Sequence, residues 1–225
     1  VRVIPNMEYA FAISDDGRYV VYASNAGNIV PGVGSGTIQV YVRDLATDTT
    51  ALASRSAAGA AANSQSDLGA ISPNGRFVSF RSFATNLAGG PFASRVYVHD
   101  RVTLATSSVP LPVLNAVTAT GCRENDVADN GVVVLTCFFG SGLFDQVYLH
   151  IPGAAGTPFL ISSDINDVAG NQVSGTRVAI DASGLSMIFD SLASNLVGND
   201  FNGVSDSFIL IDEGILDGIF ADSFE

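Results

Sequence analysis

The sequence predicts an all-β protein built from four copies of one repeat, and three observations support this. The closing glycines of one short motif, Gly17, Gly75, Gly131 and Gly184, are 58, 56 and 53 residues apart. The segments around each glycine are short runs of β-branched and aromatic residues, which favour strands. No stretch keeps the 3.6-residue periodicity of an amphipathic helix, so we expect little helix.

The motif is clearest in its first two copies. Residues 12–20 read Ala-Ile-Ser-Asp-Asp-Gly-Arg-Tyr-Val, and residues 70–78 read Ala-Ile-Ser-Pro-Asn-Gly-Arg-Phe-Val. Weaker copies follow at 127–131 and 179–184, where Val132 and Leu185 replace the arginine. Each copy predicts two strands joined by a polar turn, which the glycine closes because it adopts positive φ without strain.

Each repeat continues through two further strands. The third strand is expected at 40–42, 96–98, 147–149 and 208–210, and the fourth at 51–53 in the first repeat and 159–161 in the third. Four short antiparallel strands in a repeat of about 50 residues are typical of a propeller blade. We therefore predict one domain over 1–225, a four-bladed β-propeller with repeats at about 6–55, 64–110, 120–163 and 173–212 and an extension at 213–225.

The repeat resembles the WD40-like repeat of the TolB-type propeller family, in which a Ser-x-Asp-Gly-Arg or Ser-Pro-Asn-Gly-Arg turn recurs in each blade. The resemblance covers essentially the whole chain and is most specific over the first two repeats. It implies an architecture and says little about an activity.

The two ends of the chain have strand character but no complete repeat. Residues 1–5 stand in the register of a fourth strand, which the fourth repeat lacks, so we expect them to complete the fourth blade and close the ring. The alternative is an open ring completed by another molecule. Residues 217–225 resemble the Ile-Phe-x-Asp-Gly-Phe-Glu endings of some exported gammaproteobacterial proteins, with Ser223 in place of Gly. We expect this segment to make an intermolecular contact.

Composition limits the classes of partner. The net charge of −12 repels phosphate backbones, so nucleic acid is not expected as a partner. No apolar run reaches the roughly 18–20 residues of a membrane helix, so no transmembrane segment is expected. The absence of Lys and the abundance of Asp and Gly suggest export, and we expect an extracellular or cell-surface protein, with the periplasm as the alternative.

Cys122 and Cys137 are expected to form a disulfide. Cys122 lies nine residues before Gly131, and Cys137 lies in the strand that returns from that turn. Returning strands of one sheet can bring such positions within bridging distance. Two buried thiols are the alternative.

One loop of the fourth repeat is a candidate cation site. Asp200, Asn202 and Asp206 could supply oxygen ligands to a single structural Ca²⁺, although the spacing departs from an EF-hand. The alternative is a solvated turn, and no other cofactor is expected.

Other polar residues recur in register and are expected to be structural. His99 and His150 each follow a third strand in successive repeats. Asn28, Asn86 and Asn195 each lie eleven residues after a turn glycine and precede an aliphatic residue, as turn asparagines do. The sequence has no Gly-x-Ser-x-Gly motif, and neither histidine has an evident partner. Nothing therefore indicates a nucleophile, and no catalytic residue is predicted.

Three functions remain open from the sequence. The first is a non-enzymatic extracellular structural protein that self-assembles through its terminal strands, as a homo-oligomer or with another exported protein. The second is a ligand- or protein-binding module, and the third is an enzyme with a site in the central channel. A cluster of ionisable side chains in the channel would favour the third.

Overall fold

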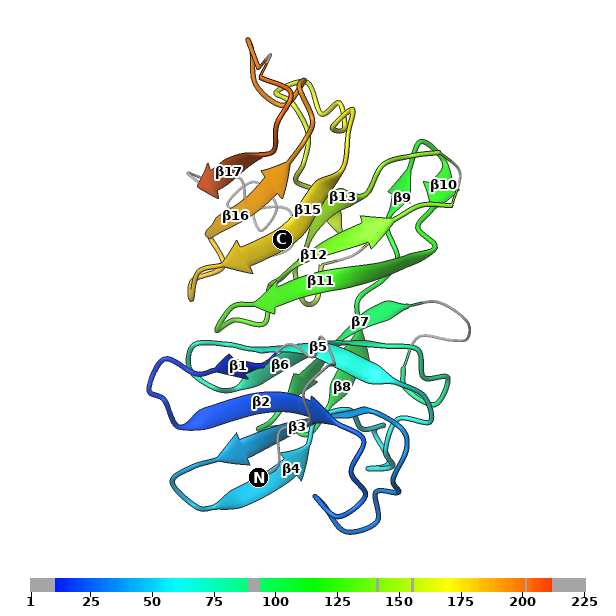
Figure 1. Cartoon of the computed structure of the whole chain (residues 1–225), viewed down its shortest axis with the longest axis vertical. Coiled ribbons are helices and arrows are strands. Elements are labelled where there is room, and N and C mark those ends of the chain that lie inside the picture. The colour runs from blue at the N-terminus through cyan, green and yellow to red at the C-terminus, as the bar shows by residue number, and fades with distance from the viewer. Residues whose placement is uncertain (1–10, 89–93, 141, 155, 201, 212–225) are drawn as a thin grey trace, which may run out of the picture.

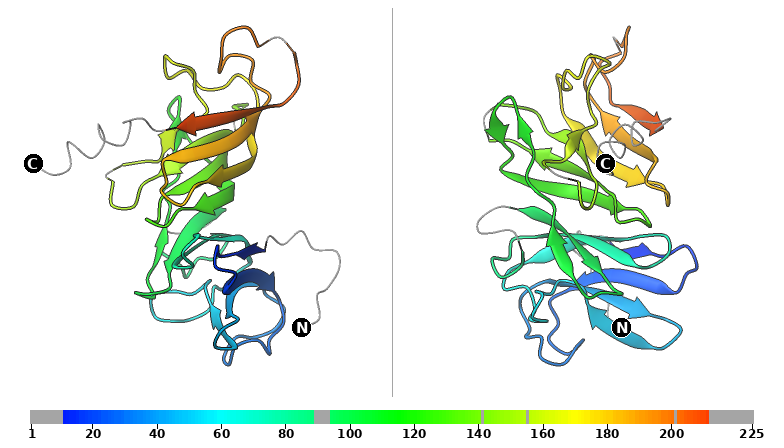
Figure 2. Two further views of the ribbon diagram at one scale, coloured as in Figure 1. Left: turned by 90° about the vertical axis from the view of Figure 1, so that its left-hand side faces the viewer. Right: turned by 180° about the vertical axis from the view of Figure 1, so that it is seen from behind.

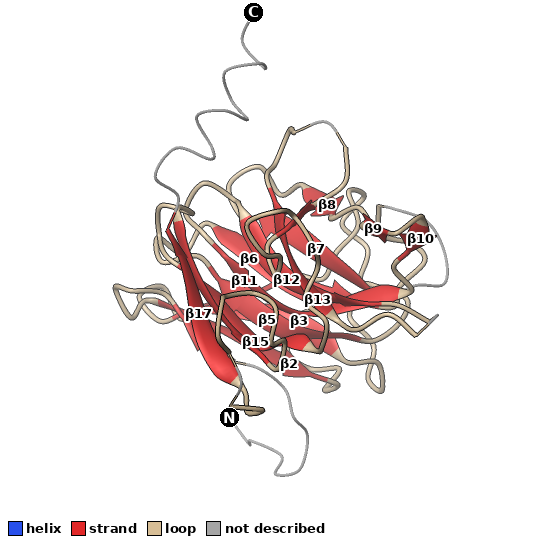
Figure 3. Ribbon diagram, turned by 90° about the horizontal axis from the view of Figure 1, so that it is seen from above, coloured by secondary structure: helices blue, strands red, loops and turns tan. Residues whose placement is uncertain are grey.

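The structure is a computed structural model that describes residues 11–88, 94–140, 142–154, 156–200 and 202–211. Four antiparallel sheets follow one another along the chain, and each is a meander in which sequence neighbours pair (Figure 1). Seen from above and coloured by secondary structure, the described residues contain strands and loops and no helix (Figure 3). The predicted all-β propeller-type architecture is confirmed.

The strands fall into four blades, numbered in chain order. Blade 1 contains β1 (Ala12–Ile13), β2 (Tyr19–Ser24), β3 (Gln39–Asp44) and β4 (Thr49–Leu52); blade 2 contains β5 (Ser66–Ile71), β6 (Phe77–Ser82), β7 (Arg95–Asp100) and β8 (Thr106–Ser108); blade 3 contains β11 (Gly121–Val127), β12 (Val133–Phe138), β13 (Gln146–His150) and β14 (Phe159–Leu160); blade 4 contains β15 (Ser174–Ile180), β16 (Ser186–Ser191) and β17 (Asp206–Ile211). One small hairpin that the sequence did not predict, β9 (Val113–Leu114) with β10 (Val117–Thr118), connects blades 2 and 3. Its turn places Asn115 and Ala116 at positive φ.

The described residues form an open row of blades. Blades 1 and 4 lie at opposite ends of this row (Figures 1 and 2). The fourth sheet has three described strands. The closing strand expected from residues 1–5 and the extension expected at 213–225 lie outside the described residues, so the expected ring closure is not made by the described part of the chain.

The turn glycines hold the hairpins as expected, with one local difference. In blade 2 the Ser72 N–H donates to the carbonyl of Phe77 at 2.8 Å, whereas in blade 3 the Ala128 N–H donates to the carbonyl of Val132, four rather than five residues on, at 2.9 Å. The third hairpin is therefore one residue shorter. Equivalent positions are best taken from the pairing of second and third strands: Tyr22 with Tyr41, Phe80 with Tyr97, Leu135 with Tyr148, and Phe189 with Phe208.

Each blade has a forward face, which points to the next blade along the chain, and a backward face, which points to the preceding one. Val42 on the forward face of blade 1 packs in one apolar cluster with Val78 and Phe80 on the backward face of blade 2. Two further clusters join blade 2 to blade 3 and blade 3 to blade 4. Three of the apolar clusters are thus interfaces between successive sheets. A fourth and smaller cluster lies on the backward face of blade 1, where Val33 packs with Tyr41 and Leu52.

Candidate functional site

The loop between β16 and β17 carries the predicted cation ligands. Asn202 Nδ2 donates to both carboxylate oxygens of Asp206, at 3.2 and 2.9 Å, and Asn202 Oδ1 accepts from the N–H of Val204 at 2.9 Å. Asp200 lines the same open hollow of about 570 Å³. Both ends of the Asn202 amide are therefore used by the loop itself, as in a turn. Within the described ranges no group of three or more His, Cys, Asp or Glu side chains could hold a metal ion, and the structural Ca²⁺ stays a prediction.

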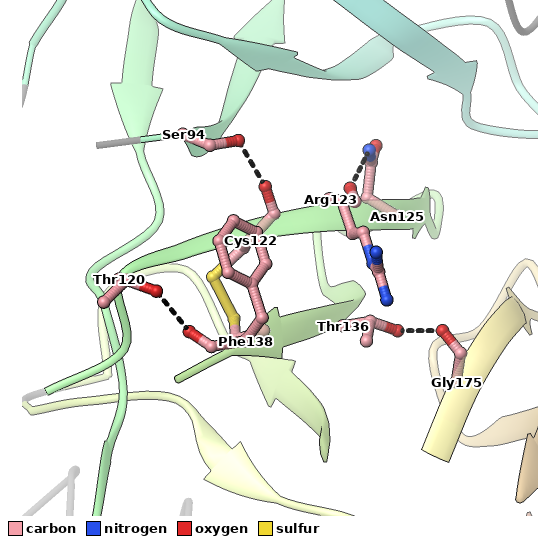
Figure 4. The surroundings of a disulfide bond; sticks show 9 residues. Ser94, Thr120, Cys122, Arg123, Asn125, Thr136, Phe138 and Gly175 are labelled. Atoms are coloured by element: carbon pink, nitrogen blue, oxygen red, sulfur yellow. Dashed lines mark hydrogen bonds between the residues drawn. A yellow bond between two sulfur atoms is a disulfide. The ribbon is translucent and has the colours of Figure 1, made fainter. Parts of the chain in front are cut away.

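The predicted disulfide is present in the structure. Cys122 in β11 and Cys137 in β12 are directly opposite one another in the sheet and are bonded (Figure 4). Both side chains are buried in the cluster that joins blade 2 to blade 3. The bond therefore ties the first strand of blade 3 to its second at the interface with the preceding blade.

The two histidines lie in separate sheets, and burial lowers the pKa of each. Nδ1 of His99 is 3.0 Å from Oγ1 of Thr106 on the neighbouring strand. Burial, reinforced by the charge of Arg55, lowers the pKa of His99 to about 4. Burial also lowers the pKa of His150. His99 is buried and His150 is half-buried, and the two rings lie on different blades, which fits the structural role expected from the sequence.

Two of the three recurring asparagines share one task. Oδ1 of Asn86 accepts from the N–H of Asn63 at 2.9 Å, and Nδ2 of Asn86 donates to the carbonyl of Ala61 at 2.8 Å. Asn195 makes the same pair of bonds to Asn171 and Ala169, at 2.8 and 3.1 Å. The partners lie more than twenty residues away, on the segment that enters the blade, so these residues join segments rather than close a local turn.

Ionisable side chains gather along the first strands of blades 2, 3 and 4. Each of these strands contains a bulge or irregularity where it pairs with the second strand, and such bulges redirect the neighbouring side chains. Arg81 makes two hydrogen bonds to the buried carboxylate of Asp67, at 2.7 and 2.8 Å. Arg123 lies next to the disulfide on β11 (Figure 4). Its guanidinium pairs with Asp145. This cluster was not predictable from the sequence, because it depends on bulges that have no turn signature.

Glu124 lies in the bulge of β11, at the centre of this cluster. Burial raises the pKa of Glu124, the charges of Arg123 and Arg81 lower it, and the charges of Asp67 and Asp190 raise it further. No hydrogen bond joins its carboxylate to another described side chain. A carboxyl group with a raised pKa among two arginines and two aspartates is a candidate for ligand binding.

The forward face of blade 4 is the largest departure from the repeat. In blades 1 to 3 the third-strand residues Val42, Val98 and Leu149 are at most 7% exposed, because the next blade covers them. Their counterpart in blade 4, Ile209, is 69% exposed. Its neighbour on the second strand, Ile188, is 42% exposed, whereas its counterparts in blades 1 to 3 are fully buried.

The backward face of blade 1 departs in the same way. Ile71, Val127 and Ile180, each the last residue before a turn, are at most 9% exposed because the preceding blade covers them. Ile13, at the equivalent position of blade 1, is 59% exposed. Tyr41 on the same face of blade 1 is fully buried, because it packs with Val33 of the loop between β2 and β3. The row of blades therefore ends in two faces with exposed apolar residues, and the chain's own loop covers part of the face on blade 1.

Solved structures place this architecture among known folds. No protein-family model and no curated protein matches the sequence. TolB from Acinetobacter baumannii matches over 92% of this chain and 43% of its own, with a TM-score of 0.51 and 12% identity. The fold is that of a TolB-like β-propeller. The chain spans less than half the length of the TolB chain it matches.

Other matches with enzyme names have lower scores. The tricorn protease matches over 82% of this chain and 19% of its own, with a TM-score of 0.48 and 10% identity. A GH74 xyloglucanase from Xanthomonas campestris matches over 90% and 38%, with a TM-score of 0.45 and 14% identity. In the part of this chain that the structure describes, no helix is long and apolar enough to cross a membrane.

Proposed function

We propose that this chain is a non-enzymatic structural β-propeller of an exported protein, and that it self-associates through the ends of its row of blades, where the terminal strands expected from residues 1–5 and 213–225 belong. One observation carries the proposal: Ile209 is exposed where Val42, Val98 and Leu149 are buried. In blades 1 to 3 the next blade covers this apolar face of the sheet, and in blade 4 the same face is exposed. An exposed apolar face of this kind marks a surface for protein contact.

The disulfide supports the location. A bond between Cys122 and Cys137 persists in oxidising compartments and is rare in the cytosol. We therefore place the protein outside the cytoplasm, at the cell surface or in the extracellular medium, with the periplasm as the alternative.

Sedimentation velocity over a concentration series tests the self-association. Ile209→Asp should shift the chain towards monomer, because a carboxylate would be desolvated in the contact. Ile165→Asp is the matched control, since Ile165 is 97% exposed in the loop between β14 and β15. Because each copy carries a net charge of −12, added salt should strengthen the association by screening repulsion. A chain that stays monomeric at the highest concentration reached would contradict the proposal.

A ligand-binding module is the second candidate function, and Glu124 is the observation that favours it. With Glu124 itself included, three acids lie beside two arginines, so an organic cation is the ligand class that fits. Chemical-shift titration with arginine methyl ester as the probe should perturb residues of β11, and Glu124→Gln should abolish the effect. Binding that survives this substitution would reject the site. A central-channel enzyme stays the third hypothesis.

A further inference from the structure

The three interior interfaces share one geometry at the rim where the turns lie. The Asp15 N–H of blade 1 donates to the carbonyl of Pro73 in blade 2, and the Asp129 N–H of blade 3 donates to the carbonyl of Ala182 in blade 4, both at 3.0 Å. Proline has no N–H, so blade 2 reaches blade 3 through the Asn74 N–H instead, which donates to Oδ1 of Asp129 at 2.7 Å. Each turn is thus hydrogen-bonded to the turn of the next blade.

The turn glycines repeat the same relation. A Cβ on Gly75 would lie 2.3 Å from the ring of Tyr19, and a Cβ on Gly131 would lie 3.4 Å from the ring of Phe77. A Cβ on Gly184 would lie 3.3 Å from Cβ of Val132. In each case the glycine packs against the start of the second strand in the preceding blade.

At the two ends of the row this relation is incomplete. Nothing lies within 4 Å of a Cβ built on Gly17 in blade 1. In blade 4 the second strand begins at Ser186, and among the described residues no turn glycine of a following blade packs against Ser186. The Ala182 N–H also has no acceptor within the described ranges. Among the described residues, no blade precedes blade 1 and none follows blade 4.

We infer that a second copy of this chain supplies the missing neighbour, with its blade 1 stacked on blade 4 of the first copy, head to tail. This deepens the proposed function, on which it rests, by naming the partner and the two surfaces. Ile188 and Ile209 would pack against the partner's Ile13, as Val21 and Val42 pack in the cluster that contains Ile71. The Ala182 N–H would donate to the carbonyl of the partner's Asp15.

Three features of the molecule identify a second copy as the occupant. The forward face of blade 4 continues the plan by which blades 1 to 3 bind their neighbours, and the backward face of blade 1 continues the complementary plan. Both surfaces belong to one chain, and they lie at opposite ends of the described row (Figures 1 and 2). A contact between two different surfaces of identical copies is heterologous, so it extends into a chain of copies unless the rotation closes a ring.

Engineered cysteines test this arrangement. Asp15 and Ala182 are exposed, and the equivalent interior pair, Asp129 and Ala182, lies in direct backbone contact, within reach of a disulfide. The described cysteines are bonded to each other, so an added cysteine supplies the reactive thiol. Mixing the Asp15→Cys and Ala182→Cys variants under mild oxidation should give a disulfide-linked dimer on a non-reducing gel, in clear excess over either variant alone.

The other outcomes separate the inference from the proposed function. If Ala182→Cys cross-links to itself as well as it does to Asp15→Cys, the copies associate through like surfaces, and only the head-to-tail arrangement fails. If the chain sediments as a monomer and no cross-link forms, self-association itself fails. If the double variant forms its disulfide within one chain at low concentration, the ring closes on itself or a terminal segment brings its ends together, which overturns the second copy as the occupant.

Discussion

The turns of blades 1 and 2 are held by arginine–aspartate pairs, whereas the turns of blades 3 and 4 have no arginine in that position. Arg18 makes two hydrogen bonds to Asp44, at 3.0 and 2.8 Å, and Arg76 makes two to Asp100, at 3.1 and 2.8 Å. Each arginine also stacks on the aromatic ring that follows it. The second strand is thus tied to the end of the third.

The second half of the chain uses other chemistry for the same hairpin. In blade 3 the disulfide joins the first strand to the second. In blade 4 the carboxylate of Asp181 accepts from the N–H groups of Leu185 and Ser186, each at 3.0 Å. The shared elements are the turn glycine and the pairing of strands, so the side-chain bonds are interchangeable. A motif that includes the arginine therefore weakens in blades 3 and 4 although the blades remain.

The largest expected effect separates an interior turn from the turn at the free end. Gly75 and Gly17 both have positive φ, +76° and +69°. At Gly75 a methyl group would also meet the ring of Tyr19, so Gly75→Ala should cost roughly 2–5 kcal/mol, from backbone strain plus overpacking. Gly17→Ala should cost only the backbone part, about 1–2 kcal/mol. Equal losses in urea unfolding would contradict the packing of blade 2 on blade 1.

The disulfide gives the next largest effect. It closes a loop across a sequence separation of 15 residues, and the chain-entropy estimate for such a loop is about 3 kcal/mol. Cys122→Ala with Cys137→Ala should therefore lower the free energy of unfolding by about that amount. Reduction of the native chain should reproduce the loss and leave the double variant unchanged. A double variant as stable as the native chain would show that blade 3 does not depend on the bond.

The sequence could predict the hairpins because their determinants are local. The residue pattern around Gly17 and Gly75 specifies a turn and two strands without reference to distant contacts, and the periodic recurrence specifies the number of blades. The β9–β10 hairpin was missed because it turns on Asn115 and Ala116, with no glycine to mark it. Ring closure could not be decided from local signals, since it depends on the rotation between successive sheets.

The candidate surfaces were harder to predict for the same reason. Ile209 fits the pattern of a third strand as well as Val42 does, and only the position of its blade in the row makes it exposed. Glu124 has no motif around it, and the bulge of β11 places it among charges from three blades. The cysteine pair was predictable because both residues lie in two strands that return on one another, although the bulge in β11 is what places Cys122 directly opposite Cys137.

A pH effect distinguishes the third-strand ends of blades 1 and 2, where Arg43 and His99 occupy equivalent positions. Burial lowers the pKa of His99 to about 4, whereas the pKa of an unfolded histidine is near 6.5. Between these pH values the unfolded chain therefore binds a proton at His99 that the native chain does not bind. Stability should therefore fall as the pH drops through this window, by about 2 kcal/mol between pH 7 and pH 5.

Urea unfolding of His99→Asn at both pH values measures this loss. The variant should lose most of the pH dependence, because asparagine does not titrate. His150→Asn reports the share of the second histidine, whose pKa is also lowered by burial. A slope that His99→Asn leaves unchanged would assign the effect elsewhere.

The smallest expected effect belongs to the ion pairs of the first two blades. The bond from Arg76 holds the pKa of Asp100 well below its usual range, with help from the Val102 N–H. Since a depressed carboxyl pKa stabilises the native state above the unfolded value, near 4, this contribution is present at pH 7 and disappears as the pH falls below that value. Arg76 is partly exposed, so water and salt screen the pair, and Arg76→Met should cost less stability than any change above.

Arg177→Met is the control, since the guanidinium of Arg177 pairs with no carboxylate in the part of the chain that the structure describes. Arg76→Met should reduce the loss of stability between pH 7 and pH 3, whereas Arg177→Met should not. If both variants behave alike, the ion pair with Asp100 adds nothing measurable to the hairpin of blade 2, which then rests on its glycine and its strand pairing.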